Sequence, residues 1–172
     1  MEKKNVLLSG EIGVGKSTAA NRALALLGLV PGGFRTHFDD TTAVDRRLYL
    51  RAADGSRACV AVRFAAWEPL VDEDCFNVFG AGLIRESLRA PLLLMDELGF
   101  LEARCEAFQA AVREALDAPV PVLVVLRQST GGWLDTIRAR PDVQLVPITA
   151  ENRDALPETL AAMLRALLPA AE

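Results

Sequence analysis

Asn5-Val-Leu-Leu-Ser-Gly10-Glu-Ile-Gly-Val-Gly15-Lys-Ser-Thr18 is the stretch that decides the fold of this 172-residue chain. Residues 10–17 match G-x-x-x-x-G-K-[ST], with a predicted strand before the motif and a helix predicted over about residues 16–27 after it. Glycines let successive backbone N–H groups turn inward around a phosphate, and the helix directs the positive end of its dipole at the same anion. The stretch therefore predicts a phosphate-binding loop in an α/β protein.

The three polar residues at the end of this loop have expected roles toward a nucleoside triphosphate. Lys16 is expected to reach the β- and γ-phosphates, Ser17 to ligate Mg²⁺, and Thr18 to contact the α-phosphate. The residues expected to bind the phosphates are Gly10, Glu11, Ile12, Gly13, Val14, Gly15, Lys16, Ser17 and Thr18. A glycine-rich turn that caps a helix would also match the motif, but the flanking strand and helix favour a nucleotide site.

A second acidic motif follows the apolar run from Leu92 to Met95. Asp96 is expected to hold Mg²⁺ and Glu97 to act as the general base for an attacking water. A solvated strand end is the simpler alternative. Residues 96–99 also fit the D-x-x-G pattern of GTP-binding proteins, although no guanine-reading N-K-x-D segment occurs. A GTPase-like switch or a nucleotide-dependent binding module therefore remains an alternative to an enzyme.

Hydrophobic periodicity predicts alternating strands and helices along the rest of the chain. Alternation from Leu48 to Phe64 around Asp54-Gly55 predicts a β-hairpin, an insertion within about residues 34–64. Residues 76–90 read as a short strand running into a helix. Further strands are expected at residues 92–95, 120–126 and 143–148, and further helices at 101–116, 133–140 and 156–168.

The expected fold is thus a single P-loop domain over residues 1–172, a three-layer α/β sandwich. Its mostly parallel sheet would be covered by helices on both faces, and ligands would bind beyond the carboxyl ends of the strands.

Composition narrows the partners and the compartment. A formal net charge of −4 argues against non-specific nucleic-acid binding, and the longest later apolar run is far too short for a membrane span. Cys59, Cys75 and Cys105 are an odd number at unrelated spacings, which favours reduced thiols. We therefore expect a cytoplasmic protein, monomeric rather than oligomeric, that binds a nucleoside triphosphate with Mg²⁺ and neither nucleic acid nor membrane.

Several further residues are candidates for roles near the nucleotide. A second cation usually assists phosphoryl transfer, and Arg127, at the end of the strand predicted over residues 120–126, is the catalytic candidate, with Gln128 as its polar alternative. Other possible cations are Arg35, Arg138 and Arg153. Thr149 with Glu151 and Asn152 can be read as the N-cap and first turn of the last helix. Trp67 and Trp133 are expected to be packing residues.

Four segments together resemble a known family, the cancer-related nucleoside-triphosphatases and their prokaryotic relatives. They are Gly10–Thr18, Gly32-Gly-Phe-Arg-Thr36, Asp96-Glu-Leu-Gly-Phe-Leu-Glu102 and Thr149-Ala-Glu-Asn-Arg-Asp154. The first is shared by very many P-loop proteins, and the other three, in this order, are more specific. The resemblance implies a RecA-like core, slow Mg²⁺-dependent hydrolysis of several nucleoside triphosphates and loose base selectivity. It also makes Asn152 and Arg153 candidates for the nucleotide loop.

The sequence departs from the family pattern in the hairpin region. Thr36 is followed by His37-Phe-Asp-Asp40, and Arg46-Arg-Leu-Tyr49 lacks the glycine that the family usually carries there. The hairpin is therefore expected to serve a different substrate or partner. A P-loop kinase, with a small phosphate acceptor held under the hairpin, is the second alternative to the hydrolase.

Overall fold

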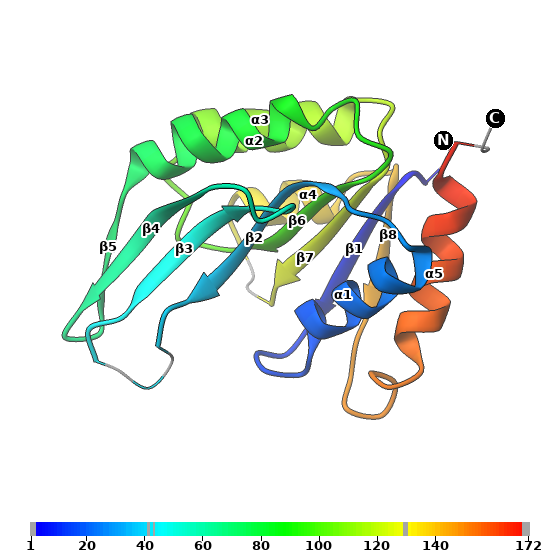
Figure 1. The fold of residues 1–172 in the computed structure, drawn as a ribbon, viewed down its shortest axis with the longest axis horizontal. Helices are drawn as coiled ribbons and strands as arrows, with labels where there is room; N and C mark the ends of the chain where they lie inside the picture. Colours follow the sequence, from blue (N-terminus) through cyan, green and yellow to red (C-terminus); the bar gives the residue numbers. More distant parts are fainter. Residues whose placement is uncertain (1–2, 41, 43, 129–130, 170–172) are drawn as a thin grey trace.

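The computed structural model describes residues 3–40, 42, 44–128 and 131–169, and within them the strands form one sheet. Its order is β5-β4-β3-β2-β6-β7-β1-β8 (Figure 1). The strands are β1 Asn5–Gly10, β2 Gly32–Phe38, β3 Arg47–Ala52, β4 Ala58–Ala65, β5 Glu68–Val71, β6 Leu93–Leu98, β7 Val122–Arg127 and β8 Val143–Pro147. The helices are α1 Lys16–Leu27, η1 Cys75–Gly80, α2 Ala81–Glu86, α3 Glu106–Asp117, α4 Trp133–Arg138 and α5 Leu156–Leu167.

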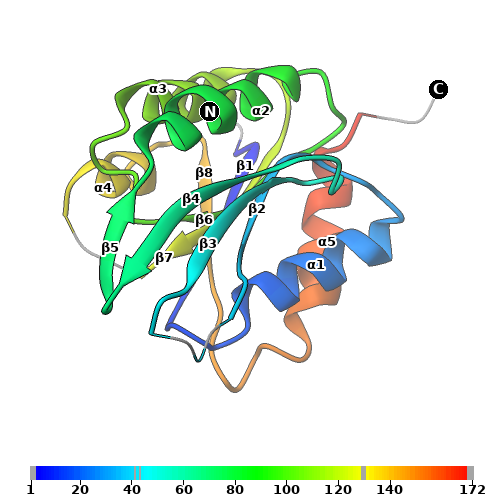
Figure 2. The same cartoon turned by 60° about the vertical axis from the view of Figure 1, so that its left-hand side comes forward.

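Strands β2, β6, β7, β1 and β8 run parallel and separate two apolar cores. Successive side chains of a strand point to opposite faces, so Val6 and Leu8 of β1 join the core under α1 and α5, whereas Leu7 joins the core under α2 and α3. Figure 2 shows α1 and α5 on one face of the sheet and α2, α3 and α4 on the other. The expected three-layer sandwich is confirmed.

The predicted hairpin is present as β3 and β4, which pair antiparallel. It continues the parallel sheet, because β3 also pairs with β2, and β2 pairs in parallel with the core strand β6. Strand β5 adds one more antiparallel edge. Gly33 lies where the two parts meet: its φ is +88°, and a Cβ atom there would stand 2.1 Å from the carbonyl oxygen of Leu94. Only glycine allows β2 to approach β6 so closely.

Two local predictions from the sequence are wrong. Residues 76–80 are not a strand but part of the π-helix η1, which leads into α2. Phe76, Leu83 and Ile84 are all buried, and their separations of seven and eight residues fit a helix better than a strand. The last helix begins at Leu156 and is not capped by Thr149. Instead, the side chain of Asn152 closes a turn, accepting from the Thr149 N–H at 2.8 Å.

The expectation of three reduced thiols is also wrong. Cys59 on β4 and Cys75 at the start of η1 have Cα atoms 6.0 Å apart and are joined as a disulfide, while Cys105 is buried and free. The two partners are 16 residues apart in sequence, and the chain folds back through β5 to bring them together, a path that spacing alone does not reveal. No helix in the described part of the chain is long and apolar enough to cross a membrane.

Candidate nucleotide site

The phosphate-binding loop connects β1 to α1 and is open on its inner side. Gly13 and Gly15 have φ values of +76° and +108°, and a Cβ atom at either would meet nothing within 4 Å. Gly15 is the N-cap of α1, so the free N–H groups of the first helical turn face the space enclosed by the loop. This conformation is the one that the motif predicts for surrounding a phosphate.

Lys16 is held at the rim of the loop by two backbone carbonyls. Its Nζ donates to the oxygen of Gly10 at 2.7 Å and to that of Glu11 at 2.8 Å. Burial lowers the pKa of this lysine, an effect opposed by the carboxylate of Glu97 and reinforced by Arg127. The ammonium group therefore already lies among the groups expected to surround the terminal phosphates.

Ser17 and Asp96 meet across the first turn of α1 and the end of β6. The Ser17 hydroxyl donates to Oδ1 of Asp96 at 2.7 Å, and only 4% of Asp96 is exposed. Burial raises the pKa of this carboxyl group, while the Ser17 hydrogen bond and the charge of Arg35 lower it. A buried carboxylate beside a hydroxyl oxygen is a pair of hard oxygen donors, which fits Mg²⁺.

Glu97 stands out of the regular ladder of β6. Asp96 pairs with Val125 and Leu98 with Leu126, so Glu97 is the extra residue of a β-bulge, and its φ is +87°. Residues other than glycine rarely adopt this backbone conformation, and those that do are concentrated at functional sites. The bulge also keeps Leu98 in the core under α3 while two consecutive acids lie at the strand end.

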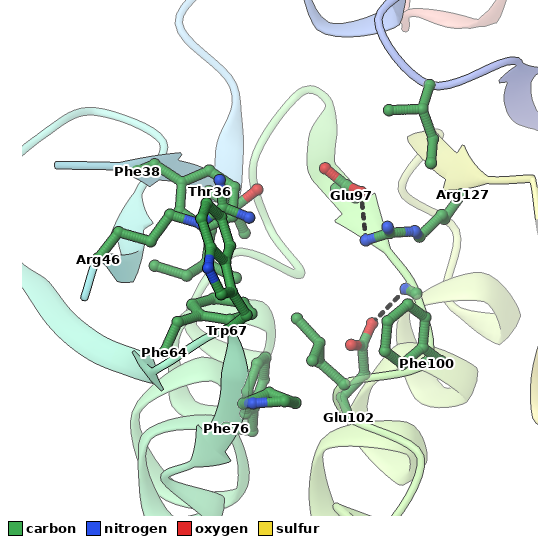
Figure 3. Close-up of a pocket in the computed structure, with 15 residues that line it drawn as sticks. Thr36, Phe38, Arg46, Phe64, Trp67, Phe76, Glu97, Phe100, Glu102 and Arg127 are labelled. Atoms are coloured by element: carbon green, nitrogen blue, oxygen red, sulfur yellow. Dashed lines mark hydrogen bonds and ion pairs between the residues drawn. The ribbon is translucent and has the colours of Figure 1, made fainter. Parts of the chain in front are cut away.

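Arg127, the last residue of β7, lies beside Glu97. Its Nη1 is 3.7 Å from Oε1 of Glu97, and its guanidinium covers the ring of Phe100 at 4.7 Å (Figure 3). The other candidate cations have different surroundings. Arg35 bonds to Asn21 and to the carbonyl of Ala53, and Arg138 donates to the Arg127 carbonyl at 2.9 Å.

Three cavities adjoin one another along this edge of the sheet. One of about 300 Å³ lies inside the phosphate-binding loop and reaches Glu97. A second, of about 460 Å³, lies between the loop and the β8–α5 turn. The third, of about 530 Å³, lies between the hairpin strands and the ends of β6 and β7, and it shares Ile12 and Glu97 with the first. The arrangement provides space for phosphates in the middle and for another group on each side.

The structure brings together Lys16, Ser17, Asp96, Glu97 and Arg127. Gln128, the polar alternative to Arg127, lines the cavity by the β8–α5 turn instead. Asn152, a candidate from the resemblance, uses its side chain within that turn, bonding to the backbone of Thr149 and Pro147.

Trp133 packs against the core as predicted, and its Nε1 donates to the Gly99 carbonyl at 3.2 Å. The same expectation is wrong for Trp67, which is 57% exposed. Sequence reasoning also missed Arg46, whose guanidinium lies over the rings of Phe38, Phe64 and Trp67. The sequence signal that could have pointed to Arg46 is the departure from the family pattern at residues 46–49.

The chain resembles known proteins over nearly its whole length. A family model described as NTPase matches residues 5–161. The nucleoside-triphosphatase THEP1 of Thermofilum pendens is 33% identical, and the match covers 98% of this chain and 99% of the relative. THEP1 of Natranaerobius thermophilus is 27% identical, with coverages of 94% and 96%.

Two solved structures share the fold. The crystal structure of THEP1 from Aquifex aeolicus has a TM-score of 0.77 at 22% identity, covering 93% of this chain and 98% of that one. The solution structure of a human cancer-related nucleoside triphosphatase has a TM-score of 0.78 at 23% identity, with coverages of 95% and 98%.

Proposed function

This chain belongs to the NTPase family, and we propose that it is a Mg²⁺-dependent phosphohydrolase that converts nucleoside triphosphates to diphosphates and phosphate. The observation that carries the proposal is that five side chains from three elements meet at one end of the parallel strands: Lys16 and Ser17 from α1, Asp96 and Glu97 from β6, and Arg127 from β7. The residue roles below are part of the proposal.

The loop binds the phosphates and Lys16 compensates their charge. Backbone N–H groups at the start of α1 donate to phosphate oxygens, while Lys16 exchanges its two carbonyl partners for the β- and γ-phosphates. Ser17 and Asp96 would hold Mg²⁺, which would supply positive charge to the phosphate groups. Preorganised charge of this kind stabilises the transition state of phosphoryl transfer.

Glu97 is the residue that handles the water. Its carboxylate orients a water molecule toward the γ-phosphorus and accepts a proton from it, and the bulge of β6 fixes its position. Arg127 directs its guanidinium to the same place, where it compensates the charge that develops on the transferring phosphoryl group.

The cavity beside the β8–α5 turn suits a base without strong discrimination. It is lined by apolar side chains such as Val14 and Ile148 and by the backbone of the turn, with Gln128, Thr149 and Glu151 as polar neighbours. Discrimination between bases needs buried polar groups that one base satisfies and another leaves unpaired. Gln128, Thr149 and Glu151 are exposed, which supports acceptance of several bases.

The test is phosphate release with Mg²⁺ and each of ATP, GTP, CTP and UTP. We expect release with all four, and a fall of about 100-fold or more in kcat for Lys16→Ala and for Glu97→Gln. Glu97→Gln should still bind nucleotide. Glu86→Gln, which changes an exposed carboxylate paired with Arg57, is the matched control and should keep the wild-type rate. Undiminished release by Glu97→Gln would refute the assigned base.

A further inference from the structure

The largest of the three cavities is lined mainly by aromatic and aliphatic side chains and lies on the hairpin side of the phosphate-binding loop. Figure 3 shows its two walls facing each other across a gap: Phe38, Phe64 and Trp67 on the hairpin side, and Glu97, Phe100 and Arg127 on the side of β6 and β7. Its volume of about 530 Å³ exceeds that of the phosphate-binding loop. Apolar, largely aromatic walls with a few convergent polar groups are typical of sites for small organic ligands.

A cation on the hairpin wall defines the ligand chemistry further. The guanidinium of Arg46 lies 4.4 Å from the ring centre of Phe38, 5.0 Å from that of Phe64 and 5.6 Å from that of Trp67. A guanidinium that lies over aromatic rings adds positive charge to a stacking surface, and such a surface attracts a planar anion. This wall therefore favours a ligand that is both planar and negatively charged.

Backbone strain in the described chain gathers at this cavity. The non-glycine residues with positive φ in the described ranges are Ala66, Trp67 and Glu97, and the last two line the cavity. Ala66 and Trp67 form the two-residue turn between β4 and β5, where both φ values are positive and Asn-Gly is the favoured pair. A bulky indole, 57% exposed, occupies the place of a glycine. Backbone strain of this kind is concentrated at binding sites, and a ligand stacked on the indole would account for it.

The cavity also opens onto the groups assigned to hydrolysis. Ile12 and Glu97 border both this cavity and the phosphate-binding loop, and Arg127 lines it beside Glu97. We propose that the cavity binds a small planar aromatic anion, stacked between Trp67 and Phe100 with its charge toward Arg46. Occupation would take the place of the water beside Glu97, so the ligand would control turnover. This control rests on the proposed hydrolase function, whereas binding itself does not.

The test uses 1-anilinonaphthalene-8-sulfonate, whose planar naphthalene ring carries a sulfonate, as the probe. Equilibrium titration of the full chain by probe fluorescence should give one saturable site, present with or without a non-hydrolysable ATP analogue and Mg²⁺. Arg46→Gln and Trp67→Gly should each weaken binding about tenfold or more, and Trp67→Phe should restore most of it. Arg63→Gln and Leu70→Ala, exposed neighbours on β4 and β5 outside this cavity, are matched controls and should bind within about twofold of the wild type.

The outcomes separate this proposal from the proposed function. Equal affinity in all the variants, or competition between the probe and the ATP analogue, would overturn the site. Where the wild type releases phosphate, the probe should lower kcat with little change in KM, because the nucleotide and probe cavities differ. A wild type that binds the probe as expected but releases no phosphate would refute the hydrolase alone. Thermal unfolding of Trp67→Gly distinguishes lost binding from lost folding.

Discussion

Replacement of Glu102 by glutamine should change how the stability of this protein depends on pH. Glu102 is 4% exposed and follows β6 in the loop toward α3. Burial raises the pKa of its carboxyl group from 4.5 to about 7, although the Gly99 N–H donates to Oε1 at 2.6 Å and favours the charged form. Between these two values the folded state holds a proton that the unfolded state has lost, so stability falls as pH rises through this range.

The difference between the ordinary pKa of 4.5 and the raised pKa of about 7 sets how much stability Glu102 removes as pH rises. At about 1.4 kcal/mol for each pKa unit, the free energy of unfolding should fall by about 2–3 kcal/mol between pH 5 and pH 8 because of this one group. Glutamine keeps the acceptor oxygen for Gly99 but cannot ionise. Glu102→Gln should therefore lack this component of the pH dependence and be more stable than the wild type at pH 8.

Urea unfolding at half-unit steps from pH 5 to pH 8 measures the difference directly. Glu106→Gln, an exposed glutamate at the start of α3, is the matched control and should follow the wild-type curve. If the difference between the wild type and Glu102→Gln were constant across this range, Glu102 would not be a buried carboxyl group that stays protonated near neutral pH.

Three further predictions concern backbone and buried polar groups. Gly33→Ala should lower the free energy of unfolding by about 3 kcal/mol or more, because its Cβ would meet the Leu94 carbonyl at 2.1 Å. Gly82→Ala, in the open on α2, should leave this free energy unchanged or raise it by about 1 kcal/mol, and urea midpoints compare the two variants. Asp142→Ala should lower the free energy of unfolding by about 3 kcal/mol in the same assay, because Arg140 and Asn5 would lose a buried partner. An unchanged free energy of unfolding would contradict this. Ala66→Asn with Trp67→Gly should raise unfolding stability by about 1 kcal/mol, and a lower melting temperature would count against strain in that turn.

The strand, loop and helix around residues 5–27 could be predicted from the sequence because the signals there are local. The motif at residues 10–18, the strand before it and helix α1 all lie where the pattern places them. The buried run ending in Asp96 and Glu97 forms β6, and the end of β7 brings Arg127 beside it. Parallel strands that end at one edge of a sheet place such residues together whatever the loops do.

The rest depended on contacts between distant segments. Neither β2, which carries two glycines, nor the short β5 has a strong alternating pattern, so the way the hairpin continues the sheet could not be read from the sequence. The cavity around Arg46 and Trp67 requires β3, β4 and the β6–α3 loop to face one another, a tertiary arrangement without a sequence motif. The bulge at Glu97 is likewise invisible in sequence, because one extra residue in a ladder is defined only by its partner strand.

The left-handed backbone at Glu97 has a consequence for anyone who evolves this protein in the laboratory. A library selected only for resistance to heat should enrich glycine at this position, because glycine alone adopts a φ of +87° without cost. The same selection should enrich Asn-Gly at residues 66 and 67. The selected variants would be more stable and would keep the sheet, but they would lose the carboxylate of Glu97 and the indole of Trp67 before other side chains.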